Sequence, residues 1–199
     1  LSSTTTKAKL NSDVNIKVAG LKAEIVCSDE DLDYALLKVK NNGKLLPLTE
    51  NNHVYLGNTD VISVGDVVYA MGYPLGLDRF VTDGIITNTK FPTYFLGMFK
   101  TRRDDAFMFN AAISPGNSGG PIFTVSDGNL YLVGVISAHY IRGNDLNIAY
   151  KINDILKDID RCGVKLDTTS IESNPTNKVS ASISSFIITN SAFFGVFVE

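Results

Sequence analysis

The feature that most constrains the fold is a succession of short apolar segments rich in β-branched and aromatic residues. These segments lie at residues 14–18, 22–26, 34–39, 67–71, 80–88, 106–109, 121–125, 130–136 and 147–152. Clusters of glycine and Asx residues separate them, such as Asn41-Asn42-Gly43 and Asp127-Gly128-Asn129. Short strands punctuated by turn residues, without alternating helices, predict an all-β barrel or sandwich.

One stretch has helical rather than strand periodicity. Apolar side chains recur every three or four residues from Ile152 to Ile159, which predicts a helix over residues 152–161 with one apolar face. Asn153 is the expected N-cap, and Gly163 is expected to end the helix. We expect this helix to pack on the barrel.

The last part of the chain changes character twice. Residues 164–177 are polar, contain Pro175 and are predicted to be a linker. Residues 178–199 are β-prone and almost uncharged, so an exposed strand there would invite edge pairing or aggregation. Two arrangements would cover them: one or two strands on this chain's own barrel, or a strand that docks on another subunit.

Composition and charge limit the possible partners and cofactors. The chain has 199 residues, of which 44% are hydrophobic, so it can bury a core. Its net charge of −3 gives no basic excess of the kind that attracts nucleic acid. It contains no apolar run of the roughly 20 residues that span a membrane, and residues 1–12 lack the basic and apolar blocks of a signal peptide. We expect no metal and no cofactor.

The two cysteines, Cys27 and Cys162, are far apart in sequence and lack the spacing of a metal site. We expect two separate free thiols rather than a disulfide or a zinc site. Free thiols would favour a reducing compartment.

The stretch "SPGNSGGPIF", residues 114–123, presents a serine on a glycine-supported turn. Glycines allow backbone geometry that other residues avoid. The amides of Gly116 and Ser118 can therefore converge on one point beside the Ser118 hydroxyl. A nucleophile next to an oxyanion hole is the arrangement that acyl transfer requires.

Several segments resemble trypsin-like serine proteases, and most closely their HtrA branch. "FNAAISPGNSGGPIF" resembles the active-serine segment, and "SDEDLDYALLKVK" resembles the strand that carries the catalytic aspartate. "VGDVVYAMGYPLGLDRFVTDGIIT" resembles the stretch between the barrels, with its turn at Gly72, Pro74 and Gly76, and "LVGVISAHY" resembles a wall of the specificity pocket. The similarity covers residues 14–160.

The resemblance implies two perpendicular six-stranded β-barrels with the site in the cleft between them, closed by a C-terminal helix. The expected protease domain is residues 1–163. The remainder of an incomplete first barrel would occupy residues 1–70, and the second barrel with the helix would occupy residues 71–163. The implied activity is a serine endopeptidase that forms an acyl-enzyme on a polypeptide substrate.

The resemblance also assigns roles to individual residues. Ser118 would be the nucleophile, and the amides of Gly116 and Ser118 would form the oxyanion hole. Asp33 would be the buried carboxylate that orients the base, because it directly precedes the apolar run 34–37. Ser137 matches a serine that hydrogen-bonds the catalytic aspartate.

The specificity pocket can be outlined in the same way. Ala112 would lie at its floor, and Ser137, Ala138 and His139 would lie along its wall. A floor without an acidic residue favours small or medium aliphatic P1 side chains over Lys or Arg. His139 leaves open a second option, an acidic or amide P1 side chain.

The general base does not match the family pattern. The family uses a histidine as the base, because imidazole titrates near neutrality. That histidine lies about 30 residues before the aspartate in the family, but this chain reads "LSSTTTKAK" at that place. The chain's two histidines, His53 and His139, both follow Asp33. We expect no role for His53, and substrate contact or packing for His139.

Three explanations for the missing base stay open. The first is that a segment ahead of Leu1 carries the histidine and the missing strands, since the chain does not begin with methionine. The partner would then be an N-terminal fragment of the same protein. The second is that residues 178–199 fill the open barrel of a catalytically inactive relative, which serves as a structural or interaction module. The third is a Ser-Asp site, or a base lent by another chain.

Overall fold

The computed structural model describes residues 16–18, 21–41, 44–45, 54–72, 80–91, 104–139, 146–164, 179–181 and 185–188. Its elements, in chain order, are β1 (Lys17–Val18), β2 (Leu21–Asp29), β3 (Tyr34–Asn41), β4 (Lys44–Leu45), β5 (Val54–Leu56), β6 (Val67–Gly72), β7 (Phe80–Asn88), β8 (Ala106–Phe109), β9 (Pro121–Ser126), β10 (Asn129–His139), β11 (Asn147–Lys151), α1 (Ile152–Arg161), β12 (Val179–Ala181) and β13 (Ser185–Ile188). The described part is therefore mostly β, as the pattern of short strands predicts. No helix in these ranges has the length and apolar character needed to cross a membrane.

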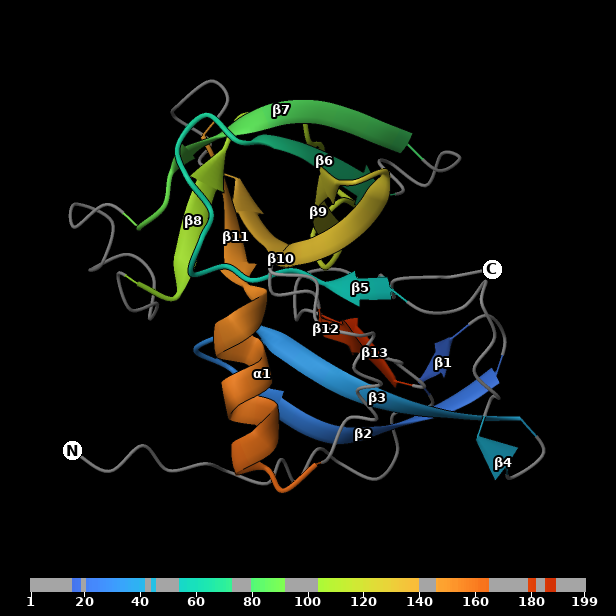
Figure 1. The fold of residues 1–199 in the computed structure, drawn as a ribbon. Helices are drawn as coiled ribbons and strands as arrows, with labels where there is room; N and C mark the ends of the chain where they lie inside the picture. Colours follow the sequence, from blue (N-terminus) through green and yellow to red (C-terminus); the bar gives the residue numbers. More distant parts are fainter. Residues whose placement is uncertain are drawn as a thin grey trace.

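Six antiparallel strands of the described residues close a barrel, which forms the upper half of Figure 1. Neighbouring strands pair in the order β11-β8-β7-β6-β9-β10, and β10 then pairs with β11 to complete the ring. The interior is filled by alternating buried side chains, including Val68, Ile86, Phe107, Phe109 and Ile122. This barrel is the second of the two that the resemblance implies.

A smaller open sheet lies below the barrel in Figure 1, beside α1. Its order is β1-β2-β3-β13, with β4 also paired to β3. Ile16, Val18, Ala23, Leu37 and Val39 form its buried cluster. The prediction of a double barrel with an incomplete first barrel is confirmed.

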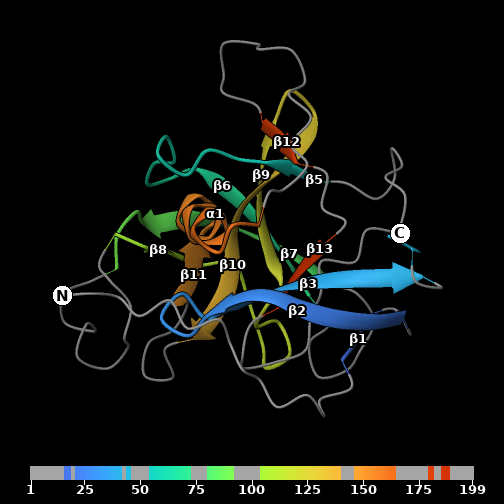
Figure 2. The same ribbon diagram turned by 90° about the horizontal axis from the view of Figure 1, so that it is seen from below.

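The C-terminal strands pack on this chain's own sheets, which is the first of the two arrangements expected for residues 178–199. β12 pairs antiparallel with β5, and β13 pairs antiparallel with β3, with Ser185 opposite Lys38 and Ile188 opposite Ala35. Figure 2 shows β12 beside β5 and β13 beside β3. β13 therefore occupies the edge of β3 that β2 leaves open.

The helix α1 has the predicted bounds, but its cap differs from the prediction. Strand β11 runs directly into the helix, so the N-cap is Lys151, which has an extended backbone and makes no side-chain capping bond. Asn153 instead accepts a hydrogen bond from the Thr59 amide at 3.2 Å and donates one to Asn58 Oδ1 at 2.9 Å. Gly163 follows the helix with φ +73, as expected for a C-terminal glycine.

The expectation of two free thiols is wrong, because Cys27 and Cys162 form a disulfide with a Cα–Cα distance of 6.1 Å. The prediction relied on their sequence separation of 135 residues. That separation does not matter here, because α1 brings Cys162 back against β2. Disulfides persist in oxidising environments, so the argument for a reducing compartment also fails.

Candidate active site

Ser118 lies half-buried on a turn between β8 and β9. Gly116 and Gly119 flank it with φ of +105 and +84, a region that only glycine adopts freely. Within the turn, the Gly120 amide donates to the Asn117 carbonyl at 2.9 Å. The glycines that the sequence pattern singles out are thus required by the backbone path.

Strand β10 fixes this turn from one side. The Gly119 amide donates to the Ile136 carbonyl at 2.6 Å, and the Ile136 amide donates to the Gly120 carbonyl at 2.9 Å. Within the described ranges, neither the Gly116 nor the Ser118 amide donates to a backbone carbonyl. These are the two amides that the sequence predicts for an oxyanion hole.

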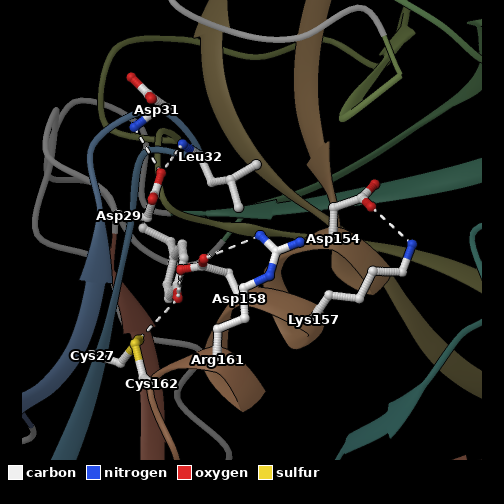
Figure 3. Close-up of polar contacts among 10 residues, drawn as sticks. Cys27, Asp29, Asp31, Leu32, Asp154, Lys157, Asp158, Arg161 and Cys162 are labelled. Carbon is white, nitrogen blue, oxygen red and sulfur yellow. Dashed lines mark hydrogen bonds and ion pairs between the residues drawn. A yellow bond between two sulfur atoms is a disulfide. The ribbon is translucent and has the colours of Figure 1, made fainter. Parts of the chain in front are cut away.

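Asp33 lies on the turn between β2 and β3, which is held by local hydrogen bonds. One carboxylate oxygen of Asp29 accepts from the amides of Asp31 and Leu32, both at 2.8 Å (Figure 3). Asp33 itself has φ +48, a left-handed conformation that is uncommon outside glycine. Its side chain is half-buried, less than the expected buried carboxylate.

Ser137 joins Asp33 to the strand that holds the Ser118 turn. Its hydroxyl donates to Asp33 Oδ2 at 2.8 Å. Ser137 lies where the register of β10 against β11 shifts between Ile136 and Ala138, and such a bulge re-aims a side chain. Two successive residues of β10 therefore contact the two parts of the site, Ile136 the serine turn and Ser137 the aspartate.

A buried polar cluster lies behind the Asp33 turn. The Tyr34 hydroxyl donates to Asp158 Oδ2 at 2.7 Å and lies 3.1 Å from Cys27 Sγ. A disulfide sulfur carries no proton, so Cys27 cannot donate to the Tyr34 hydroxyl. Burial, together with the hydrogen bond to Asp158, raises the pKa of Tyr34 above its usual range.

The same cluster does not form a metal site. Ligand atoms of Cys27, Asp158 and Cys162 lie within 4.8 Å of one another. However, the two sulfurs are bonded to each other, and the Asp158 oxygens face the Tyr34 hydroxyl and the Arg161 guanidinium, the latter at 3.7 Å. Figure 3 shows Asp158 and Arg161 beside the disulfide.

The segment expected to form the pocket floor is held by two flanking strands. Thr82 of β7 donates its hydroxyl to the Ala112 carbonyl at 2.7 Å. The buried Asn147 of β11 donates its side-chain amide to the Ala111 carbonyl, also at 2.7 Å. Ala112 is exposed. Asn147 pairs with His139 across the sheet, so it connects the expected floor with the expected wall.

The remaining expected site residues are placed only in part. Ala138 and His139 form the end of β10, opposite Ile148 and Asn147. His53 and the turn at residues 73–79 lie outside the described residues.

Sequence reasoning missed Tyr34, Thr82, Asn147 and Asp158. Only Asp158 left a usable signal, because a carboxylate stands on the apolar face of the predicted helix, three residues after Ile155. Such a residue is expected to have a buried partner. For the other three, the partner is far away in sequence and no local pattern identifies it.

Comparison with known proteins gives consistent results. Residues 2–135 match the family model of the trypsin-like peptidase domain. The magnetosome formation protease MamE of Paramagnetospirillum magneticum is 39% identical over 118 residues, 59% of this chain and 15% of MamE. A probable periplasmic serine endoprotease DegP-like of Pseudomonas putida is 34% identical over 137 residues, 66% of this chain and 25% of that protein.

Among solved structures, the HtrA-type protease AlgW with a decapeptide is similar, with a TM-score of 0.58 and 30% identity. The match covers 76% of this chain and 47% of that one. The chain spans a quarter or less of the length of these two curated relatives.

Proposed function

Because the chain belongs to the trypsin-like peptidase domain family and is of its HtrA type, we propose that its parent protein is a serine endopeptidase that hydrolyses polypeptides through an acyl-enzyme. The observation that carries the proposal is the hydrogen bond from Ser137 to Asp33 on the strand that also holds the Ser118 turn. Through these contacts, a carboxylate and a glycine-supported serine from distant parts of the sequence both lie against β10.

In this mechanism, Ser118 attacks the scissile carbonyl while a base removes its proton. The negative charge that develops on the carbonyl oxygen is stabilised by the amides of Gly116 and Ser118. Asp33 orients the base and stabilises its protonated form. The base then protonates the leaving amine, and water hydrolyses the acyl-enzyme.

We assign the base to a histidine on a segment ahead of Leu1, where the family pattern expects it. Neither His53 nor His139 precedes Asp33 in the chain. The partner of this chain is then the N-terminal part of the same protein, and the polypeptide substrate binds across both.

The proposed specificity is for small or medium aliphatic P1 side chains. Ala112 offers no charge for a basic side chain, and its carbonyl is already engaged by Thr82. Asn147, held against Ala111, would stand between the floor at Ala112 and the wall at Ser137, Ala138 and His139. Recognition of an acidic or amide P1 side chain through His139 is the alternative that a library of peptide substrates would detect.

The test is covalent labelling of Ser118 with a fluorophosphonate probe, in the protein that includes the residues encoded ahead of Leu1. Labelling is expected in the wild type and is abolished in Ser118→Ala. Ser114→Ala is the matched control, since it removes a hydroxyl from the same turn outside the proposed chemistry. Equal labelling of the wild type and Ser118→Ala, or none in a folded wild type, would contradict the proposal.

One observation favours a second function, a protease-like scaffold without activity. β13 lies on the edge of β3 next to Asp33, so part of the open barrel is filled by the chain's own tail. An inactive relative stabilised in this way would act as a structural or interaction module. A folded wild type that resists the probe and forms a stable assembly would support this function.

A further inference from the structure

The turn that carries Asp33 is followed directly by Tyr34, which forms a buried pair with Asp158. Neither residue has a role in the proposed chemistry. Tyr34 and Asp158 are 3% and 4% exposed, and their side chains meet over 2.7 Å across 124 residues of sequence. Burying a carboxylate is costly even when it is hydrogen-bonded, so stability alone is a weak reason for such a pair.

The position of Tyr34 in the turn suggests another reason. Asp33 has φ +48, and for a residue other than glycine this conformation costs on the order of 1 kcal/mol. Anchoring both ends of the turn favours this conformation. Asp29 fixes the entry through the amides of Asp31 and Leu32. Tyr34, the next residue after Asp33, fixes the exit.

The partner of Tyr34 belongs to an element anchored in the other barrel. α1 begins where β11 of the closed barrel ends, and Asp158 lies near the end of the helix, beside Tyr34. The disulfide then joins Cys162, just after the helix, to Cys27 of β2, the strand that leads into the turn. The backbone at Asp33 is thereby fixed relative to the barrel that carries Ser118.

We propose that Tyr34 and Asp158 are positioning residues for Asp33: their hydrogen bond holds the left-handed turn so that the Asp33 carboxylate meets the Ser137 hydroxyl. The functional meaning of this inference rests on the proposed role of Asp33. Its structural content, the dependence of the Ser137–Asp33 hydrogen bond on the Tyr34–Asp158 pair, is testable without any catalytic activity.

The test uses the ¹³C chemical shift of the Asp33 carboxyl group at neutral pH in the 199-residue chain. Ser137→Ala gives the value for a lost hydrogen bond. Tyr34→Phe deletes only the hydroxyl and is expected to move the shift more than half of the way to that value. Tyr69→Phe, which removes the hydroxyl of a tyrosine packed against the buried apolar cluster that includes Tyr34, is the matched control and should leave the shift unchanged.

Two variants of the acceptor separate positioning from packing. Asp158→Asn keeps an acceptor for the Tyr34 hydroxyl and should retain the wild-type shift of Asp33. Asp158→Leu removes the acceptor and should behave like Tyr34→Phe. This pair also decides the question if Tyr34→Phe does not fold. A wild-type shift of Asp33 in folded Tyr34→Phe or Asp158→Leu would overturn the inference.

A second measurement connects the pair to the proposed function. With the residues ahead of Leu1 present, Tyr34→Phe is expected to slow fluorophosphonate labelling of Ser118 by about tenfold or more, as expected when a catalytic group is misplaced. Asp158→Asn should label at close to the wild-type rate. If the wild type is not labelled at all, the proposed function fails, while the carboxyl shift still decides the positioning role.

Discussion

Breaking the disulfide should reveal how much stability the contact between β2 and the end of α1 contributes. The bond closes a loop with a sequence separation of 135 residues, and loop-closure entropy for that length amounts to about 5 kcal/mol. In a domain of this size, that loss corresponds to a fall in Tm of roughly 10–20 °C. Cys27→Ser and Cys162→Ser are the perturbations, because serine replaces sulfur with the smallest change in shape.

The assay is urea denaturation of the wild type, the two single variants and the double variant, followed by circular dichroism. Either substitution opens the same loop, so the two single variants and the double variant should lose about the same free energy of unfolding. Reduction with dithiothreitol should lower the wild type by the same amount and leave the variants unchanged. The slope of unfolding against urea should rise in the wild type on reduction, because the open chain exposes more surface.

Two results would refute this reasoning. A loss below about 1 kcal/mol in every variant would mean that the loop is not closed by this bond, since native disulfides usually contribute more. A double variant that loses the sum of the two single losses would mean that the sulfurs act as independent packing groups. The wild type under reducing conditions would then unfold as it does under oxidising conditions.

Three further outcomes are expected. Ser137→Ala should lower the free energy of unfolding by about 1–2 kcal/mol, because the half-buried Asp33 carboxylate loses a hydrogen-bond donor. Urea denaturation measures this loss, with Ser126→Ala, at the exposed end of β9, as the control. Tyr34 keeps its proton in the folded state, whereas its hydroxyl in the unfolded chain ionises near pH 10. The free energy of unfolding should therefore fall as pH rises above about 10, by at most about 1.4 kcal/mol per pH unit. This extra slope should vanish in Tyr34→Phe, and a slope unchanged by that substitution would contradict the burial of the hydroxyl. Ending the chain at Val164 removes β12 and β13 and exposes the edges of β3 and β5. Light scattering should then detect self-association, and a peptide of residues 179–199 added in trans should suppress it. A monomeric truncated chain would show that these edges need no cover.

The parts of the fold that could be predicted are those specified locally. β7 and β8 have the predicted bounds, because each is a β-branched or aromatic run bounded by turn residues. α1 ends where predicted, because Gly163 supplies the left-handed residue that follows the helix. β4 and β5 were missed, since strands of two and three residues owe their existence to pairing with distant partners rather than to a local pattern.

The same distinction explains the candidate site. The turn at Ser118 could be predicted from its glycines, because positive φ is a local requirement of the backbone. The disulfide was not predictable, because its formation depends on where α1 ends relative to β2. The prediction of Asn153 as the cap is wrong for a similar reason. Strand β11 runs directly into the helix, so the N-cap is Lys151, and the side-chain amide of Asn153 donates to Asn58 instead.

The site residues divide between the two barrels, so their relative position is a property of the contacts that join the barrels. The turn that carries Ser118 is held by β10 of the closed barrel, whereas Asp33 lies between β2 and β3 of the open sheet, whose other described strands are only two to four residues long. Such a sheet is a weak support for a carboxylate that, in the proposed mechanism, has to be placed within a fraction of an ångström. Ser137 of the closed barrel contacts Asp33 directly, and Asp158 of α1 contacts the next residue, Tyr34. In the proposed arrangement, the second barrel and its helix hold the aspartate in place, and the contact between Asp33 and Ser137 depends little on the short strands of the open sheet.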